Sequence, residues 1–364
     1  MPSGRSLAAL NPTPSKSVAP LGLAALRAAC LAAARGKRRS PDVAAFLLDR
    51  AAHLDALHRE LESRTYRPGP GHSFWINDPK RRRIFALPFR DRVAQHVLIT
   101  ATLPILERWY ASQSYACRTG KGTHRCLRRA IELTRAKRFV LRIDVRKFFP
   151  SIDHGILRRL LDPLTPPELR WLRDTFLDAP VDCEHVAWHF PGDDLFTPCM
   201  RPHGLPIGSL TSQVWANAFL TPVDHLLASH LGIGTFVRYC DDILVFDDDP
   251  GRLRETLAAI ERQAHTLRLR LHRVKTRLHR TADPVAFLGF VLRRVDDGVQ
   301  IRLRSENVRR FRQRMAVTHA LFEAGALDPP EVIAQVRAWL AHARHGHTRT
   351  LCERELAKLV FVRR

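Results

Sequence analysis

The sequence predicts an α+β fold, in which an antiparallel sheet is combined with helical lobes. Strand-forming apolar residues fill two segments, 139–144 and 235–246. Elsewhere apolar residues recur at helical spacing, and these expected helices alternate irregularly with the strands and hairpins. A doubly wound parallel sheet requires a regular alternation of strand and helix, so the irregular order favours the α+β class.

The N-terminal third is predicted to be helical after a tail. Residues 1–35 are expected to be disordered or loosely attached, because proline, serine and alanine dominate their first half. A helix over 40–61 follows, and its opening Ser-Pro pair suits an N-cap and a first helical position. We expect a short strand at 73–76, a basic turn at 79–83, and a helix at 91–109 despite its internal proline.

The central part contains a candidate core strand. The run at 139–144 is apolar almost throughout, which is typical of a central strand covered on both faces. Residues 180–203 form a polar excursion rich in proline and glycine. The other expected elements are helices at 154–161, 167–178, 209–231 and 253–267, strands at 269–272, 285–292 and 299–303, and a basic helical segment at the C-terminal end.

Two adjacent carboxylates interrupt the second strand-forming segment. Asp241 and Asp242 stand in the run Tyr-Cys-Asp-Asp at 239–242, where a tight turn is expected. Neighbouring like charges repel one another and are costly to bury, so a strand core gains nothing from them. At the tip of a hairpin they can share a divalent cation that offsets the repulsion. The pattern therefore predicts a metal site.

A third acid stands at the end of the other apolar strand. Phosphoryl transfer onto a 3′-hydroxyl uses two Mg²⁺ ions, which prefer a few carboxylates on rigid elements. Asp144 ends the run at 139–144 and is far from Asp241 in the chain, so the fold must bring the two together. Asp153 is expected to cap the following helix, and Asp247, Asp248 and Asp249 to form a solvated turn.

Composition bounds the class of partner. The 59 Lys and Arg residues against 36 Asp and Glu give a net charge of +23, which favours a polyanionic partner such as nucleic acid. The seven cysteines are an odd number without a C-x-x-C pair, which favours reduced thiols inside a cell. No apolar run approaches the about 18 residues of a membrane span, so no membrane partner is expected.

Several segments, taken in chain order, resemble the conserved blocks of bacterial reverse transcriptases. Asp144 with the run Phe-Phe-Pro-Ser-Ile-Asp at 148–153 resembles their first catalytic block, and the Tyr-x-Asp-Asp hairpin resembles their metal-binding motif. The other segments that resemble such blocks are 114–124, 204–213, 271–276, 287–290 and 339–343. These segments lie between residues 114 and 343, and the resemblance as a whole runs from about residue 36 to 350.

The resemblance implies a right-hand polymerase. It implies fingers at 36–138, a palm at 139–292 that carries the Tyr-x-Asp-Asp hairpin on an antiparallel sheet, and a helical thumb at 293–364. The implied activity is that of an RNA-directed DNA polymerase with two Mg²⁺ ions and dNTP substrates. Its partners would be a template RNA and the RNA/DNA hybrid, in a bacterial cytoplasm. The basic run at 302–314 would be a thumb helix that follows the duplex.

The resemblance also assigns roles. Asp144, Asp241 and Asp242 would hold the metals, and Lys275 would donate a proton to the leaving pyrophosphate or contact a phosphate. Phe149 would be a steric gate against a ribose 2′-hydroxyl or an ordinary core residue. The residues expected at the nucleotide are Lys80, Arg82, Phe149, Ile207, Gly208, Gln213 and Tyr239, and those expected at the template or primer are Arg118, Lys121, His124, Phe287, Leu288 and Gly289.

The stretch at 207–213 bears on the subtype. Most reverse transcriptases carry Gln where Ile207 stands and Pro where Gln213 stands. The version found here resembles enzymes of diversity-generating retroelements, which copy with errors and use a small basic accessory subunit. An Ile side chain cannot hydrogen-bond the incoming nucleotide, so less binding energy depends on correct pairing. A retron or antiviral defence enzyme, and a catalytically inactive RNA-binding scaffold, remain as alternatives.

One rival site is a zinc site in the excursion. Cysteines and histidines there have passable ligand spacing. The residues concerned are Cys183, His185, His189, Cys199 and His203. Because histidine is abundant in the chain at 18 copies, this spacing is a weak signal.

Overall fold

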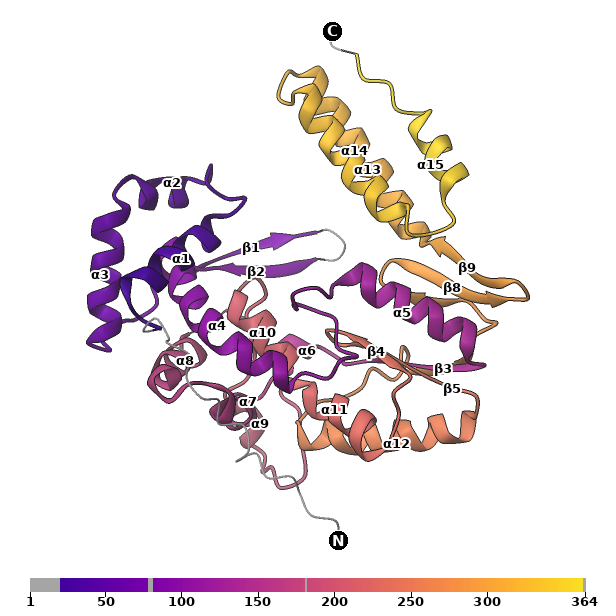
Figure 1. Cartoon of the computed structure of the whole chain (residues 1–364), viewed down its shortest axis with the longest axis horizontal. Coiled ribbons are helices and arrows are strands. Elements are labelled where there is room, and N and C mark those ends of the chain that lie inside the picture. Colours follow the sequence, from indigo (N-terminus) through magenta and orange to yellow (C-terminus); the bar gives the residue numbers. More distant parts are fainter. Residues whose placement is uncertain (1–19, 78–80, 181, 363–364) are drawn as a thin grey trace. The chain divides into compact units, whose positions relative to one another are not determined.

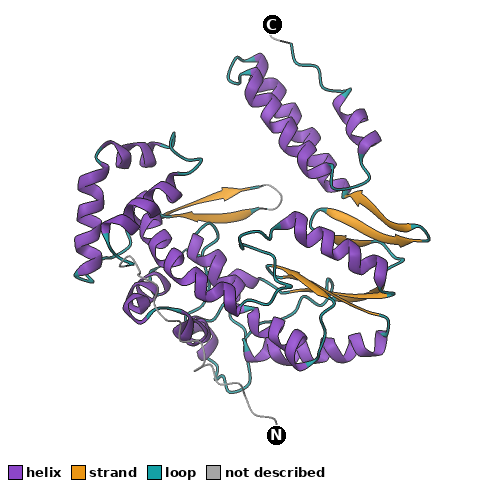
Figure 2. Cartoon of the chain, in the orientation of Figure 1, coloured by secondary structure: helices purple, strands orange, loops and turns teal. Residues whose placement is uncertain are grey.

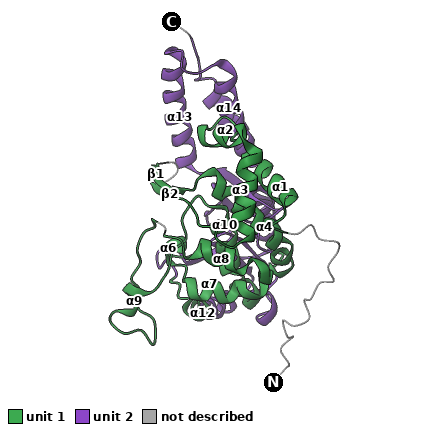
Figure 3. Ribbon diagram, turned by 90° about the vertical axis from the view of Figure 1, so that its left-hand side faces the viewer, with its two compact units in different colours: residues 1–112, 145–226, 261–270 green, residues 113–144, 227–260, 271–364 purple. Residues whose placement is uncertain are grey.

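The computed structural model describes residues 20–77, 81–180 and 182–362 (Figure 1). The chain divides into two compact units, each made of segments that are distant in sequence (Figure 3). The first unit comprises residues 1–112, 145–226 and 261–270, and the second comprises the remainder, 113–144, 227–260 and 271–364. This division follows packing and does not coincide with sequence boundaries at 138/139 or 292/293.

Helices dominate the first unit (Figure 2). Its longest helix, α4 (Phe89–Trp109), contacts α1, α2 and α10, and the internal Pro104 does not end it, as predicted. The other helices of this unit are α1 (Leu23–Ala34), α2 (Pro41–Leu48), α3 (Arg50–Glu62), α6 (Phe148–Ser151), α7 (His154–Leu161), α8 (Arg170–Leu177), α9 (Thr197–Met200), α10 (Leu210–Phe219) and α11 (Thr221–His225), with short 3₁₀ turns at Asp162–Leu164 and Pro167–Leu169.

The N-terminal prediction is wrong in two places. Part of the segment expected to be a loose tail is the helix α1, whose Leu26 and Cys30 are fully buried and which contacts α3 and α4. Small alanines let this helix approach its neighbours closely. The single helix expected at 40–61 is two helices, because the backbone leaves helical geometry at Asp49 (φ −121°, ψ 53°). Ser40 and Pro41 do occupy the N-cap and first position of α2.

A two-stranded sheet completes the first unit. The strands β1 (His72–Ile76) and β2 (Arg82–Ala86) pair antiparallel, with Phe74 opposite Ile84. The basic turn expected at 79–83 therefore ends in a strand, and residues 78–80 lie outside the described part of the chain. β2 is joined to the segment before α10, because the amide of Phe85 donates to the carbonyl of Ile207 over 2.9 Å.

The second unit is built on two antiparallel sheets. In the four-stranded sheet the order is β4-β5-β3-β6, and in the three-stranded sheet it is β7-β8-β9. The strand expected at 139–144 is β3, and it is central as predicted. The strands are β3 (Phe139–Asp144), β4 (Phe236–Tyr239), β5 (Asp242–Asp247), β6 (Arg277–Arg280), β7 (Val285–Phe287), β8 (Phe290–Val295) and β9 (Gly298–Leu303).

Helices cover these sheets. The helix α5 (Thr123–Ala136) contacts β4 and β5 of one sheet and β8 and β9 of the other, and its buried Leu127 and Leu133 enter the common core. The other helical segments are α12 (Pro250–Thr266), whose last turns belong to the first unit, α13 (Ser305–Glu323), α14 (Pro329–Ala343), α15 (Arg349–Leu356) and a π-helical turn at Leu226–His230. No helix in the described ranges is long and apolar enough to span a membrane.

The strand predicted at 269–272 is reduced to a short pairing with the end of β3, in which the amide of Arg146 donates to the carbonyl of Arg270 and the amide of His272 to that of Asp144, each over 2.8 Å. Residues 273–275 form a turn, in which the amides of Lys275 and Thr276 both donate to the carbonyl of His272. The strand that pairs with β3 begins only at Arg277. The apolar Leu269 and Leu271 attracted the prediction, but Leu269 is instead bonded back to the end of α12 through Ala264.

Candidate active site

The three predicted metal ligands lie at one end of the four-stranded sheet. In the antiparallel pairing of β3 with β5, Asp144 stands directly opposite Asp242. In the pairing of β4 with β5, Tyr239 stands opposite Asp242, so Cys240 and Asp241 form a two-residue turn between them. Residues opposite one another on antiparallel strands project to the same face. The fold therefore brings Asp144, Asp241 and Asp242 together from two distant segments.

Lys275 is the fourth group at this end. Its Nζ atom donates to both carboxylate oxygens of Asp144, over 3.0 and 3.1 Å. The turn at 273–275 is held against the end of β3, since the amide of His272 donates to the carbonyl of Asp144 over 2.8 Å. A second cation, Arg142, donates through Nη2 to Oδ1 of Asp242 over 3.3 Å. Asp144 and Asp242 are thus each paired with a cation of the protein, which partly offsets the local negative charge.

Asp241 is the least compensated of the three acids. Burial raises its pKa to about 6, and the charges of Asp242 and Asp144 add to that shift. Its own backbone amide and the more distant Lys275 act in the opposite direction without cancelling it. Burial also raises the pKa of Asp242, although Arg142 opposes the shift. An added divalent cation would relieve these repulsions, so the electrostatics of the acids suit a cation.

The donor set fits Mg²⁺, but the carboxylates are not arranged as a finished cage. Within the described ranges, no group of three or more His, Cys, Asp or Glu side chains is placed to hold a metal ion. Both oxygens of Asp144 accept from Lys275 in this structure. Asp144 would have to exchange Lys275 for the metal. Oxygen ligands on rigid strand ends remain the chemistry that Mg²⁺ prefers.

The turn that carries Asp241 is strained and braced. Cys240 has φ +54°, which is uncommon for a residue with a side chain. The fully buried Arg238 supports it by donating to the carbonyl of Cys240 over 3.2 Å. Ser114 forms a parallel bridge with Arg238, and a hydrogen bond from Cys240 lowers the pKa of the Cys117 thiol to about 7. The loop at 113–117 therefore holds the turn in place.

The residues expected at the template or primer belong to the same unit. The hydroxyl of Thr123, which precedes His124, donates to the Tyr239 hydroxyl over 3.0 Å, and Lys121 lies over the Tyr115 ring at 4.7 Å. Arg118 donates to the carbonyl of Ser114. Phe287 is buried in β7, and Leu288 and Gly289 form the next turn, both with positive φ. These placements leave their nucleic-acid roles as predictions.

The remaining residues expected at the nucleotide lie in the first unit. The amide of Leu205 donates to the carbonyl of Phe149, and the ring of Phe149 meets that of Phe148 at 5.7 Å. Gly208 has φ +117° and leaves no room for a Cβ, which would lie 2.8 Å from Ile84. The others are the half-buried Ile207, the exposed Gln213 on α10 and the exposed Arg82 at the start of β2. Lys80 lies outside the described residues.

The zinc alternative is not supported in the described part of the chain. The five candidate ligands do not form a group that could hold a metal ion. His203 donates through Nδ1 to the carbonyl of Pro150 over 2.9 Å, and the Cys183 thiol points to the carbonyl of His203 at 4.0 Å. Asp153 behaves as predicted, since its side chain caps α7 by accepting from the amide of Ile156.

Two residues at the site were missed in the sequence. Arg142 stands two positions before Asp144 on β3, so the strand period of two places both on one face and could have identified it. Arg238 could not have been identified, because an arginine inside an apolar strand has no sequence signal for the carbonyl that it supports. Its neighbours Val237 and Phe236 are fully buried with it.

The chain belongs to the reverse transcriptase (RNA-dependent DNA polymerase) family, whose sequence profile matches residues 76–292, more than half of the chain. That range contains the three acids and Lys275. Among individual relatives, the retron Mx65 reverse transcriptase of Myxococcus xanthus is 30% identical over 152 residues, which is 40% of this chain and 34% of the relative. Protein YkfC of Escherichia coli (strain K12) is 26% identical over 189 residues, 49% of this chain and 46% of that protein. The chain thus matches less than half the length of either relative.

Proposed function

We propose that this chain is an RNA-directed DNA polymerase that copies a template RNA into cDNA. The observation that carries the proposal is the register of β3 with β5, which pairs Asp144 with Asp242 and sets Asp241 beside them. Membership of the reverse transcriptase family supports the same activity. The uncompensated charge of Asp241 gives the site a reason to bind cations, which a purely structural strand end would lack.

The proposed cofactor is a pair of Mg²⁺ ions held by Asp144, Asp241 and Asp242. When bound, two such ions activate the attacking 3′-hydroxyl and stabilise the triphosphate and its leaving group. Release of Asp144 would leave Lys275 beside the site with its proton. Lys275 would then donate this proton to the pyrophosphate oxygen as the bond to the incoming nucleotide's α-phosphorus breaks.

The nucleotide-binding roles are proposed for residues of the first unit. Phe149 would exclude a ribose 2′-hydroxyl, and Arg82 with Lys80 would contact the triphosphate of the dNTP. The hydrogen bond between Phe85 and Ile207 supports a shared role for β2 and the segment at 204–213, since it ties the two together. Tyr239, Gly208 and Gln213 complete the proposed set.

Lobes and partners follow from the same proposal. Residues 36–138 would be fingers, 139–292 a palm and 293–364 a thumb, acting on template RNA and RNA/DNA hybrid in the bacterial cytoplasm. Arg118, Lys121, His124 and the turn at 287–289 would contact template or primer. The net charge of +23 supports a nucleic-acid partner.

Two subtypes remain in competition. Ile207 and Gln213 support an error-prone enzyme of a diversity-generating retroelement with a small basic accessory subunit. The similarity to the retron Mx65 reverse transcriptase supports a retron or antiviral defence enzyme instead. A template repeat and its variable copy in the flanking DNA would favour the first, and a gene for a structured non-coding RNA beside this one would favour the second.

A primer-extension assay tests the activity. With poly(rA)/oligo(dT), dTTP and Mg²⁺, the parent should extend the primer, and Asp241→Asn should lower the rate by at least about 100-fold because it removes a metal-binding charge. The matched control is Asp249→Asn, an exposed acid beyond the far end of β5 that accepts from the amide of Gly251 in its own turn.

The alternative of another class is a catalytically inactive RNA-binding scaffold. It predicts that the parent binds the hybrid without extending it, and that Asp241→Asn and Asp249→Asn behave alike. This result, obtained with folded proteins, would remove the enzymatic proposal.

A further inference from the structure

A basic hollow lies in the second unit, between the start of α5 and the end of α14. It has a volume of about 680 Å³ and opens widely to solvent. The described residues that line it include three permanent cations and no acid. They are Gly120, Lys121, Gly122, Thr123, His124, Arg125, Arg128 and His342. A hollow of this composition selects for an anion.

Three histidines from different parts of the unit meet here. The rings of His124 and His345 are stacked, with centroids 3.7 Å apart and planes inclined by 23°. The ring of His342 lies 6.4 Å from that of His124 and packs on Phe290 at 4.7 Å. Gly289 permits this approach, because a Cβ there would lie 3.0 Å from Nε2 of His342. The histidines are therefore held together by packing.

Burial and neighbouring groups disfavour the protonated form of His342 and His345 while no anion is present. Burial, followed by the nearby His124 and His345, lowers the pKa of His342. Burial, His124 and Arg128 lower the pKa of His345. The other charged groups that line the hollow are Lys121 and Arg125, and a cation close to an imidazole disfavours its protonated form. If both stacked imidazoles become imidazolium ions, their repulsion raises the free energy of the protein unless an anion lies between or beside them.

We propose that His124, His342 and His345 form a binding site for backbone phosphates of nucleic acid that takes up protons when a phosphate binds. The inference rests on the proposed function for the identity of the polyanion, but not on any chemical step. A phosphodiester supplies negative charge that stabilises the imidazolium form. The site thus differs from a lysine and arginine surface, whose charge does not change near neutral pH.

The sign of the linkage follows directly. The free His342 and His345 rings have lowered pKa values, and a bound phosphate raises them, so the complex holds more protons than the free protein between the two values. Binding therefore strengthens as the pH falls through that window, by up to about tenfold per pH unit for each proton taken up. Above the window His342 and His345 stay neutral, and the permanent cations Lys121, Arg125 and Arg128 carry the phosphate binding.

A nucleic-acid strand fits the hollow better than a free anion does. The three cations, His124 and His342 line a wide-open hollow with a volume of about 680 Å³, and they do not surround one enclosed point. Successive phosphates of a strand can engage such a surface together. A single inorganic phosphate would meet only part of it and would compete weakly.

Calorimetric titration of the full chain with an RNA/DNA hybrid tests the inference. Titrations at about pH 6.5, in two buffers with different ionisation enthalpies and at fixed salt, give the number of protons taken up. The parent should take up between about one and three protons. The variant His124→Gln/His342→Gln/His345→Gln should take up nearly none and should bind at least about tenfold more weakly at about pH 6, with a much smaller loss at about pH 8.

Two controls keep the test sharp. His319→Gln changes a histidine of the same unit that pairs with Glu323 outside the hollow, and it should leave proton uptake unchanged. His124→Gln/His345→Gln removes only the two exposed rings, so it retains the packing of His342 on Phe290 if the triple variant fails to fold. Inorganic phosphate in place of the hybrid tests the alternative source of the anion.

The outcomes separate this inference from the proposed polymerase. Equal proton uptake by parent and variants, or stronger proton-linked binding of inorganic phosphate than of the hybrid, would overturn the inference whether or not the primer is extended. Loss of proton uptake in the histidine variants would support it even if the parent shows no extension.

Discussion

Asp241 carries a charge that the isolated fold does not favour. Its pKa is raised to about 6 by burial and by the neighbouring Asp242 and Asp144. The folded state therefore binds a proton more tightly than the unfolded chain, where an aspartate titrates near 3.9. Stability associated with this group is present at low pH and is lost as the pH rises through about 6.

Replacing this charge should stabilise the protein while abolishing catalysis. In EDTA at about pH 7.5, Asp241→Asn should raise the free energy of unfolding by roughly 1 to 3 kcal/mol, because the uncompensated carboxylate is gone. The gain should vanish below about pH 4, where the parent residue is protonated as well. Thermal unfolding followed by circular dichroism across this range measures both effects.

Thermal unfolding in the presence of Mg²⁺ provides a control for this stability measurement. Mg²⁺ should raise the melting temperature of the parent and leave Asp241→Asn almost unchanged, since the variant lacks the charge that gains from the ion. The exposed Asp249→Asn should respond to Mg²⁺ as the parent does. A variant that melts below the parent in EDTA at neutral pH would contradict the assigned electrostatics.

At the residue scale, the acids were predictable and their partners less so. Asp144, Asp241 and Asp242 stand out in the sequence because carboxylates at the ends of apolar strands are costly to bury unless they have a partner. The contact of Lys275 with Asp144 depends on a turn at 273–275 that the sequence did not indicate. Neither sequence spacing nor charge could show that the Cys117 thiol would meet Cys240.

Among the elements, the joint between β2 and the segment at 204–213 depends on one glycine. Gly208 has φ +117°, and a Cβ there would lie 2.8 Å from Cγ2 of Ile84 and 3.0 Å from the carbonyl oxygen of Phe85. The hydrogen bond from Phe85 to Ile207 requires this approach. Gly208 is therefore fixed by both backbone conformation and space.

A side chain at position 208 should loosen this joint. Gly208→Ala should lower the free energy of unfolding by roughly 2 to 4 kcal/mol, from strain and steric displacement together. If the segment serves nucleotide binding, KM for dNTP should rise more than kcat falls. Chemical denaturation and steady-state kinetics provide the two readouts.

Gly192 offers a matched control in the same unit. It also has positive φ, at +90°, but a Cβ there would meet no atom within 4 Å. Gly192→Ala should cost only the backbone strain, roughly 1 kcal/mol, and should leave KM unchanged. Equal effects of the two substitutions would show that the approach to β2 does not matter.

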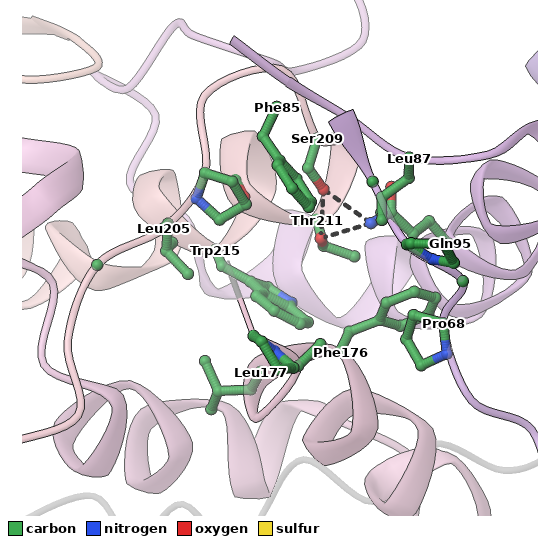
Figure 4. A pocket seen from close by; sticks show the side chains of 18 residues that line it. Pro68, Phe85, Leu87, Gln95, Phe176, Leu177, Leu205, Ser209, Thr211 and Trp215 are labelled. Atoms are coloured by element: carbon green, nitrogen blue, oxygen red, sulfur yellow. Dashed lines mark hydrogen bonds between the residues drawn. The ribbon is translucent and has the colours of Figure 1, made fainter. Parts of the chain in front are cut away.

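Beside this joint lies a largely apolar cavity, and the sequence did not indicate which elements would enclose it. It has a volume of about 320 Å³ and is lined by Phe85, Phe176 and Trp215, with the Gln95 amide donating to the hydroxyls of Ser209 and Thr211 (Figure 4). Segments distant in sequence supply its walls. Helical and strand periods identified most of the individual elements correctly, but no period indicates which elements meet, and apolar spacing alone overestimated the strand at 269–272.

On the scale of the whole molecule, the charge of +23 overstates the cations available to nucleic acid. Arg312, within the basic run at 302–314, donates through Nε and Nη2 to the buried Glu355 over 2.6 and 2.7 Å. Arg304 pairs with Glu306. Arg302 lies in β9, so the run expected to be one helix is divided between a strand and α13.

Two arginines of α13 should therefore respond differently to substitution. Arg309 is exposed, and Arg309→Gln should reduce the slope of log K against log salt for hybrid binding by about 0.7 to 0.9, if it contacts one phosphate. Arg312→Gln should leave the slope nearly unchanged and lower stability by roughly 1 to 3 kcal/mol, because Glu355 loses its main partner. Fluorescence anisotropy at several salt concentrations and thermal unfolding distinguish them.

The salt slopes of the two variants also test which face of α13 contacts the duplex. A smaller salt slope for Arg312→Gln than for Arg309→Gln would indicate that α13 presents its other face to the duplex. The sequence could supply the total charge but not this distinction, since both residues look alike until the fold pairs one of them with Glu355.

The connection between β3 and β4 has a consequence for how such proteins can diversify. The chain leaves the second unit after Asp144, forms part of the first unit, and returns before β4. The register of β3 with β5 sets the spacing of the acids. Residues inserted or deleted between 145 and 226 therefore do not change which carboxylates stand opposite each other. Insertions or deletions at 180–203 should therefore leave Asp144 opposite Asp242.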